Sequence, residues 1–180
     1  METIETERLR IRRLRDEDLD GLYEVCGDPE LMRYVGDGRP LTREQTRRWI
    51  EKSQGNYERH GFGCAAVVLK DGGRFAGYCG LVYGHGGADV EIIYALKREF
   101  RGAGLAGEAA RAVIEYGFAE CGLSRIVATI DPANAASVRV ADKLGMTHRE
   151  DRLDEHGLPE AVYAVDRTDY GEVRAGGAGA

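Results

Sequence analysis

The segment Arg101-Gly102-Ala103-Gly104-Leu105-Ala106 has the composition of a phosphate-binding turn. It follows a β-prone run at residues 90–96 and leads directly into a sequence with helical periodicity. Glycines at such a turn leave backbone N–H groups uncovered, and a helix N-terminus adds partial positive charge. The pattern predicts a cradle for a pyrophosphate group, while a simple tight turn is the alternative explanation of the same glycines.

Two common nucleotide-binding motifs do not account for this turn. The sequence has no G-x-x-x-x-G-K-[ST] pattern, which excludes a P-loop. The glycine pair lies in the middle of the chain after hairpin-like segments, and no acidic residue closes a following strand about 20 residues later. A dinucleotide-binding Rossmann unit is therefore disfavoured.

The segments around the turn alternate between strand-like and helix-like patterns. β-prone runs predict strands at residues 7–12, 64–69, 75–83, 90–96, 125–130, 146–149 and 161–166. Asp16 is expected to cap a helix that ends before Gly27-Asp28-Pro29, and Thr42 with Gln45 forms the capping box of a second helix. Further helices are expected at residues 104–120 and 135–144.

These elements predict an α+β fold with three layers. Short glycine-rich links favour antiparallel hairpins, whereas the helix between strands 90–96 and 125–130 favours a parallel crossover. We expect a mixed, mostly antiparallel sheet of about seven strands with helices on both faces. The sequence has no internal repeat or linker, which predicts one domain over residues 1–170 and a flexible Gly/Ala tail at 171–180.

Composition restricts the class of protein. The 180 residues include 25 basic and 31 acidic side chains, and the net charge of −6 disfavours a nucleic-acid-binding surface. No apolar run is long enough to span a membrane, and residues 1–15 lack the apolar core of a signal peptide. We therefore expect a cytoplasmic protein that contacts neither nucleic acid nor a membrane.

The four cysteines and four histidines are scattered. Cys26, Cys64, Cys79 and Cys121 form no C-x-x-C pair, and no His/Cys spacing matches a metal site. We expect buried, reduced thiols and no metal cofactor.

The glycine turn and a second segment together resemble the GNAT superfamily of acyl-CoA-dependent N-acyltransferases. Residues 101–106 match the family signature Q/R-x-x-G-x-G/A, and Asp131-Pro132-Ala133-Asn134-Ala135-Ala136-Ser137 followed by Lys143-Leu144-Gly145-Met146 is similar to its second motif. The opening residues 5–12 and the segment 28–34 resemble the branch that includes the ribosomal-protein acetyltransferases RimJ and RimL.

The resemblance implies acetyl-CoA as the co-substrate. It places the pyrophosphate on the backbone of Arg101, Gly102, Ala103, Gly104, Leu105 and Ala106, and the pantetheine arm along Tyr94, Ala95 and Leu96. It also implies that strand 90–96 splays away from strand 125–130. A pantetheine amide can then replace hydrogen bonds that the diverging strands lose.

The resemblance also suggests catalytic roles for three residues. Asn134 is expected beside the pantetheine arm and Ser137 beside the departing thiolate, although both are also good helix-capping residues. Glu91 is the candidate base that takes a proton from the incoming amine, with a solvated strand carboxylate as the alternative. Direct attack on the thioester gives the cysteines no catalytic role.

Two positions depart from the family pattern. Many relatives carry a Tyr general acid where this chain has Ala141, and a basic residue where it has Ala103. On the acceptor side, the resemblance implies that the first two helices and their loop cover the amine, which makes Met32, Arg33, Tyr34 and Trp49 candidate contacts.

The leading functional hypothesis is an acetyl-CoA-dependent N-acetyltransferase that acts on a primary amine. The resemblance to RimJ and RimL favours a protein N-terminal amine, such as that of a ribosomal protein. The alternatives are a small-molecule amine, such as a polyamine, an amino sugar or an amino acid derivative, and a non-catalytic acyl-CoA-binding module.

Overall fold

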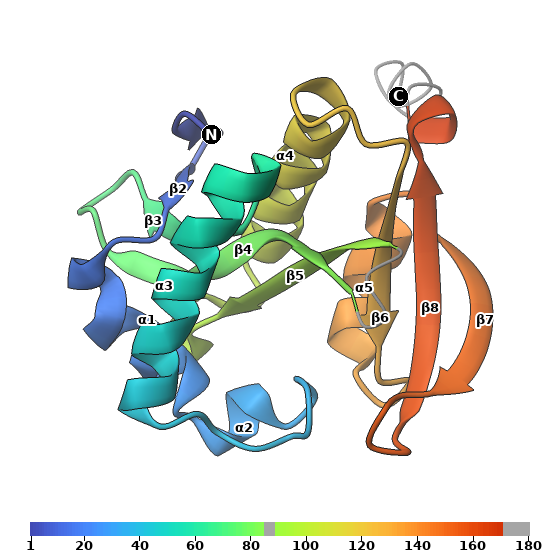
Figure 1. The fold of residues 1–180 in the computed structure, drawn as a ribbon, viewed down its shortest axis with the longest axis horizontal. Helices are drawn as coiled ribbons and strands as arrows, with labels where there is room; N and C mark the ends of the chain where they lie inside the picture. Colours follow the sequence, from blue (N-terminus) through green and yellow to red (C-terminus); the bar gives the residue numbers. More distant parts are fainter. Residues whose placement is uncertain (85–88, 171–180) are drawn as a thin grey trace.

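The fold is built on one mixed sheet, seen in a computed structural model that describes residues 1–84 and 89–170 (Figure 1). Across the sheet, the strand order is β1-β2-β3-β4-β5-β6-β8-β7. The strands are β1 (Ile4–Glu5), β2 (Leu9–Arg13), β3 (Cys64–Leu69), β4 (Phe75–Tyr83), β5 (Val90–Leu96), β6 (Arg125–Ile130), β7 (Thr147–Leu153) and β8 (Pro159–Asp166).

Helices cover both faces of the sheet (Figure 1). On one face lie α1 (Leu19–Cys26), α2 (Pro29–Met32) and α3 (Arg43–His60), which share a buried apolar cluster with Cys64, Ala66, Val68 and Tyr78. On the other face lie α4 (Leu105–Ala119) and α5 (Ala135–Lys143), whose cluster extends under most of the sheet. The predicted three-layer α+β class is therefore confirmed.

The predicted number of strands is wrong by one. The additional strand is β1, whose two residues pair with β2 through Ile4 and Ile11. A two-residue strand is too short to show a period of two, so the sequence offers no signal for it. The strands predicted at 146–149 and 161–166 are also longer in the structure, where they are β7 and β8. The full length of β7 was not predicted because this strand is exposed throughout and lacks an apolar alternation.

The N-terminal helices differ in detail from the prediction. Asp16 does not cap α1 but begins a 3₁₀ turn that ends at Asp18, and Asp18 accepts the backbone N–H of Arg15 at 2.8 Å. α1 does end at Cys26, yet Asp28 then caps the short helix α2, which the sequence analysis missed. The capping box of α3 is confirmed by reciprocal bonds between Thr42 and Gln45.

The feature that positions the site is the relation of β5 to β6. These two strands are parallel and form one registered pair, Glu91 with Val127. Other neighbouring strands are antiparallel, and β6 pairs with β8 over six residues. β5 and β6 therefore separate beyond Glu91, and Figure 1 shows them diverging. The predicted tail at 171–180 and part of the glycine-rich link at 84–87 lie outside the described residues.

Candidate active site

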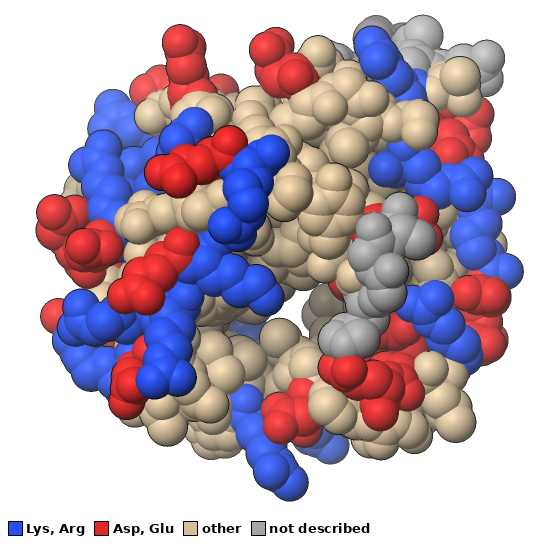
Figure 2. All heavy atoms as spheres, in the orientation of Figure 1, with Lys and Arg blue, Asp and Glu red and all other residues tan. Residues whose placement is uncertain are grey.

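A cavity of about 590 Å³ lies where β5 and β6 diverge. Its walls come from β5, β6, the start of α5, the loop after α2 and the link between β7 and β8. Figure 2 shows the surface hollowed near the centre of the view, between the α1–α3 side and the β6–β8 side. Residues far apart in the sequence therefore meet in one enclosed space.

Glu91 lies in the wall of this cavity, at the one position of β5 that is registered with β6. Its Oε1 accepts the Thr129 backbone N–H at 3.2 Å and also the Thr129 hydroxyl. Burial raises the pKa of Glu91 above 4.5, and the bonds from Thr129 oppose that rise. A partly desolvated carboxylate with a raised pKa has the properties of a general base.

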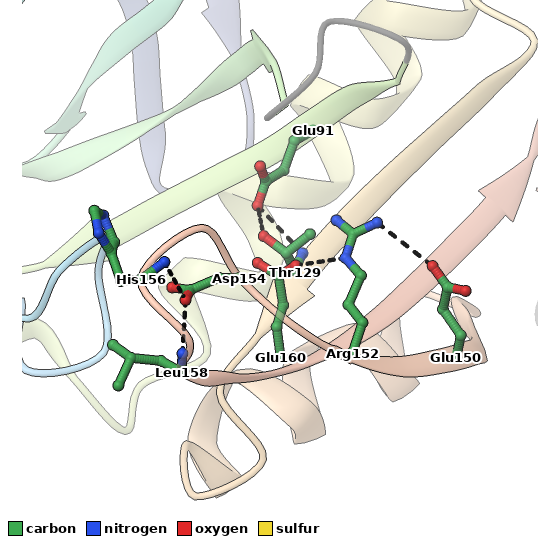
Figure 3. Close-up of polar contacts among 8 residues, drawn as sticks. All are labelled: Glu91, Thr129, Glu150, Arg152, Asp154, His156, Leu158 and Glu160. Carbon is green, nitrogen blue, oxygen red and sulfur yellow. Dashed lines mark hydrogen bonds and ion pairs between the residues drawn. The ribbon is translucent and has the colours of Figure 1, made fainter.

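Next to Glu91, an ionic group extends across β8 and β7 (Figure 3). Arg152 donates from Nε to Glu160 Oε2 at 2.8 Å and from Nη1 to Glu150 at 3.4 Å. Arg152 and Glu160 line the cavity, whereas Glu150 does not. Sequence reasoning missed this group, because its members lie on strands whose pairing the sequence does not reveal.

Asn134, Ser137 and Tyr94 form another side of the cavity. Asn134 caps α5 by accepting the Ser137 N–H at 3.2 Å, so the helix-capping role left open by the sequence is present. The Tyr94 hydroxyl donates to the Ser137 carbonyl at 3.4 Å, and burial raises the pKa of Tyr94 to about 12. This bond joins β5 to the start of α5 beside the strand opening.

The glycine turn has the geometry of an anion cradle. Gly102 and Gly104 have φ of +78° and +79°, and α4 begins directly afterwards at Leu105. The first helical bond of α4 runs from Glu108 N–H to the Gly104 carbonyl at 3.1 Å, so the preceding N–H groups lie ahead of the ladder. A Cβ at Gly102 or Gly107 would meet no heavy atom within 4 Å.

That open space fits the pyrophosphate predicted for the turn, with Arg101 exposed beside it. Arg8, which the sequence analysis did not consider, supports the loop. It donates to the Ala103 carbonyl at 2.9 Å and forms a 2.6 Å ion pair with Glu108 on α4. Arg8 and Ala103 are 95 residues apart, so no local pattern in the sequence indicates this contact.

The remaining candidates fall in different places. Arg33 and Tyr34 line the main cavity, whereas Met32 is buried in the α1–α3 cluster. Trp49 lines a second cavity of about 280 Å³ and packs edge-on against Tyr78, with ring centroids 4.8 Å apart.

Three further positions lie away from the main cavity. Ala95 packs against the α1–α3 cluster, and Leu96 is buried in the opposite one. Ala141, the position of the family tyrosine, is also buried in the α4–α5 cluster.

The cysteines all carry free thiols, three of them buried and Cys121 half-buried. Within residues 1–84 and 89–170, no group of three or more His, Cys, Asp or Glu side chains is arranged to hold a metal ion. No helix in this described part of the chain is long and apolar enough to cross a membrane.

The diverging strands and the glycine turn agree with the acetyltransferase fold that the sequence resembles. The family model "Acetyltransferase (GNAT) domain" matches residues 8–147, so the chain belongs to the GNAT family of acetyl-CoA-dependent acetyltransferases. The protein YkkB of Bacillus subtilis is 37% identical over 161 residues, covering 88% of this chain and 92% of YkkB. The B. subtilis N-acetyltransferase YnaD is 35% identical, covering 79% and 81%.

Solved structures share the fold. A GNAT-family acetyltransferase from Bacillus anthracis superimposes with a TM-score of 0.80 at 31% identity, covering 91% of this chain and 98% of that one. RimL, a ribosomal L7/L12 acetyltransferase solved with coenzyme A, has a TM-score of 0.77 at 18% identity, covering 92% of this chain and 98% of RimL, which shows the fold alone.

Among the sequence relatives, spermidine N(1)-acetyltransferase of Escherichia coli is 26% identical over 152 residues, covering 82% of this chain and 77% of that enzyme.

Proposed function

We propose that this protein transfers an acetyl group from acetyl-CoA to a primary amine that enters the cavity at Glu91. The observation that carries the proposal is the position of Glu91, a partly desolvated carboxylate at the one β5 residue registered with β6, next to the strand opening. Acetyl-CoA supplies the activated acyl group, whose bond to sulfur breaks as the carbonyl carbon bonds to the amine nitrogen.

The chain's own residues then have distinct tasks. The backbone at residues 101–106 binds the pyrophosphate, and the Asn134 amide and Ser137 hydroxyl, at the start of α5, contact the pantetheine arm and the departing sulfur. Glu91 accepts the proton that the ammonium must lose before its nitrogen can attack. Thr129 holds Glu91 Oε1 in place.

A protein N-terminal amine is the first candidate acceptor. Its support is the similarity of residues 5–12 and 28–34 to the RimJ and RimL branch. Chemistry also favours it, because an α-amine with a pKa near 8 is about one-tenth neutral at pH 7, whereas a lysine-like amine with a pKa near 10.4 is almost fully protonated.

A small cationic amine is the second candidate, and the charge of the cavity favours it. Six carboxyl-bearing residues line the cavity against two arginines, so its field attracts cations. The relation to spermidine N(1)-acetyltransferase points the same way.

A thiol-release assay with acetyl-CoA tests the proposal. The panel contains peptides with free N-termini, the same peptides with blocked N-termini, and diamines and polyamines. Turnover with at least one free amine is expected, together with its loss in Glu91→Gln, which has almost the same shape without the charge. Coenzyme A binding without turnover on any amine would contradict the proposal and favour a non-catalytic binding module.

An experiment in the organism that makes this protein distinguishes the two classes of acceptor. If a protein N-terminus is the acceptor, mass spectrometry of ribosomal proteins from a deletion strain will show a lost N-terminal acetyl group. Unchanged N-termini would favour small amines.

A cytoplasmic location belongs to the same proposal, because all four thiols are free and disulfides are rare in the cytosol.

A further inference from the structure

Polar side chains lie on one face of the sheet across four neighbouring strands. Thr129 on β6 lies opposite Val162 on β8, and Glu160 is two residues from Val162, so both side chains share a face. Arg152 on β7 lies directly opposite Glu160. Glu91 on β5 contacts this group from the other side of β6 through its bonds to Thr129.

Glu91 and Glu160 therefore flank Thr129 from opposite sides. Paired strands lie about 4.8 Å apart, so at the Glu91–Val127 pair the backbones of β5 and β8 lie about 10 Å apart across β6. Both carboxylates line the main cavity. In Figure 3 one oxygen of Glu160 is bonded to Arg152, and the other points away from Arg152.

The surroundings of Glu160 favour a positively charged ligand. Its side chain is only 19% exposed, and its Oε2 accepts the 2.8 Å bond from Arg152. Arg152 is shared with Glu150, so one guanidinium serves two carboxylates. A half-buried carboxylate gains further stabilisation from another cation.

We infer that Glu160 is a second acceptor-binding carboxylate, which holds the ammonium group of the acceptor together with Glu91, and that Arg152 is its positioning residue. An ammonium carries three N–H donors, enough to contact both carboxylates at once. The ligand class is a protonated primary amine, whether it belongs to a peptide N-terminus or to a small oligoamine. This inference rests on the proposed function.

Groups from every neighbouring element contribute to the charge around Glu91. Glu160 raises its pKa, Arg152 and Thr129 lower it, and Tyr78 faces it from β4. The other charged or titratable groups lining the cavity are Arg33 and Tyr34 after α2, Asp89 before β5, Tyr94 on β5, Asp131 after β6 and residues 154–156 between β7 and β8.

The test compares Glu160→Gln with Glu150→Gln in the full-length protein. Both variants remove a carboxylate that binds Arg152, but only Glu160 lines the cavity. With the best acceptor found for the wild type, we expect Glu160→Gln to raise the acceptor KM about ten- to hundredfold, the effect of one lost hydrogen bond to a charged group. The KM for acetyl-CoA should stay within about twofold, and Glu150→Gln should match the wild type in both values.

The pH profile supplies a readout that a merely structural role would not move. Removing the negative charge of Glu160 should shift the acidic limb of kcat/KM to lower pH, because the pKa of Glu91 falls. Arg152→Met should shift that limb to higher pH, whereas Arg152→Lys should keep it close to its wild-type position. Isothermal titration of the acceptor into each coenzyme A-loaded variant measures binding independently of turnover.

The possible results are distinguishable. A wild type without turnover on any amine overturns the proposed function and this inference with it. An active wild type in which Glu160→Gln behaves like Glu150→Gln overturns the inference alone. If Glu160→Gln instead lowers the melting temperature and raises the KM values for the acceptor and for acetyl-CoA together, Glu160 is structural and the inference also fails. In that case Glu160→Asp would show the same loss of stability and the same rise in both KM values.

Discussion

One face of the sheet changes character between its two halves, and β5 is the border. Over β2 to β5 this face is covered by α1 and α3, and the side chains beneath them are apolar and buried, including Ala66, Val68 and Tyr78. Over β6, β8 and β7 the same face carries Thr129, Glu160 and Arg152 and lines the cavity. We call these the covered half and the open half.

β5 passes from one half to the other within a few residues. Glu91 lies in the open half, whereas Ile93 and Ala95, two and four residues further along the same face, pack against the α1–α3 cluster. A covered strand face must be apolar because it is removed from water, and an open one can keep ionisable groups. The site therefore lies where helical cover ends, with a packed core beside it that fixes the strand.

The largest expected effect lies in the open half. Glu91→Gln should lower kcat/KM about 10²- to 10⁴-fold, the usual contribution of a general base. Steady-state kinetics across pH measures it, and a variant within twofold of the wild type would contradict a base at this position.

The same substitution should raise stability at neutral pH. The pKa of folded Glu91 is raised, so protonation stabilises the fold, and this contribution is present below the ordinary value of 4.5 and lost as pH rises through the folded pKa. Gln keeps the uncharged state at every pH. Thermal melting should therefore show the variant to be more stable than the wild type at pH 7, with the difference vanishing towards pH 4.

In the covered half, substitutions should act on stability. Ile50 on α3 is 1% exposed, and Ile50→Ala should lower the free energy of unfolding by about 2–5 kcal/mol through lost burial and a cavity. Leu153 on β7 is 67% exposed, so Leu153→Ala should change it by less than about 0.5 kcal/mol. Urea unfolding measures both, and equal losses would show that the two halves do not differ in packing.

A smaller functional effect is expected at Thr129. Thr129→Val keeps the β-branched shape but removes the hydroxyl that donates to Glu91, while the backbone N–H bond remains. We expect kcat/KM to fall about tenfold and its acidic limb to move to higher pH, because the hydroxyl bond lowers the pKa of Glu91. An unchanged limb would show that Thr129 does not act on the carboxylate.

The smallest effect is expected at the start of α3, in the covered half. Thr42→Ala removes one side of the capping box and should cost about 1 kcal/mol of unfolding free energy. Activity should be unchanged, since Thr42 does not line the cavity. A change in acceptor KM without a loss of stability would link this helix end to the site.

Local patterns were sufficient for most of the elements. The bounds of β3, β4, β5 and β6 agree with the predicted runs, because each is a compact β-prone segment between glycine-rich links or turns. Asp16 was assigned the wrong role, since capping residues also favour 3₁₀ turns and a single sequence does not choose between them. The two-residue β1 exists through its pairing with β2 alone.

The candidate site was predictable only in part. Asn134 and Ser137 were predicted from a motif and Glu91 as a carboxylate on the strand before the glycine turn, and the structure brings all three to one cavity. Arg8, Arg152 and Glu160 were missed, because each is an ordinary charged residue until its partners are known. Met32 and Trp49 were predicted as acceptor contacts, but Met32 is buried in the α1–α3 cluster and Trp49 lines the second cavity.

The sequence by itself determined the glycine turn before α4, the strand that carries Glu91 and the alternation of strands and helices, because these depend on residues close together along the chain. Only the tertiary structure decided that the pairing of β5 with β6 is limited to Glu91 and Val127, and that β8 and β7 bring Glu160 and Arg152 to the same cavity. Strand pairing between positions as far apart as Glu91 and Val127 depends on which faces the helices bury, and no local pattern contains that information.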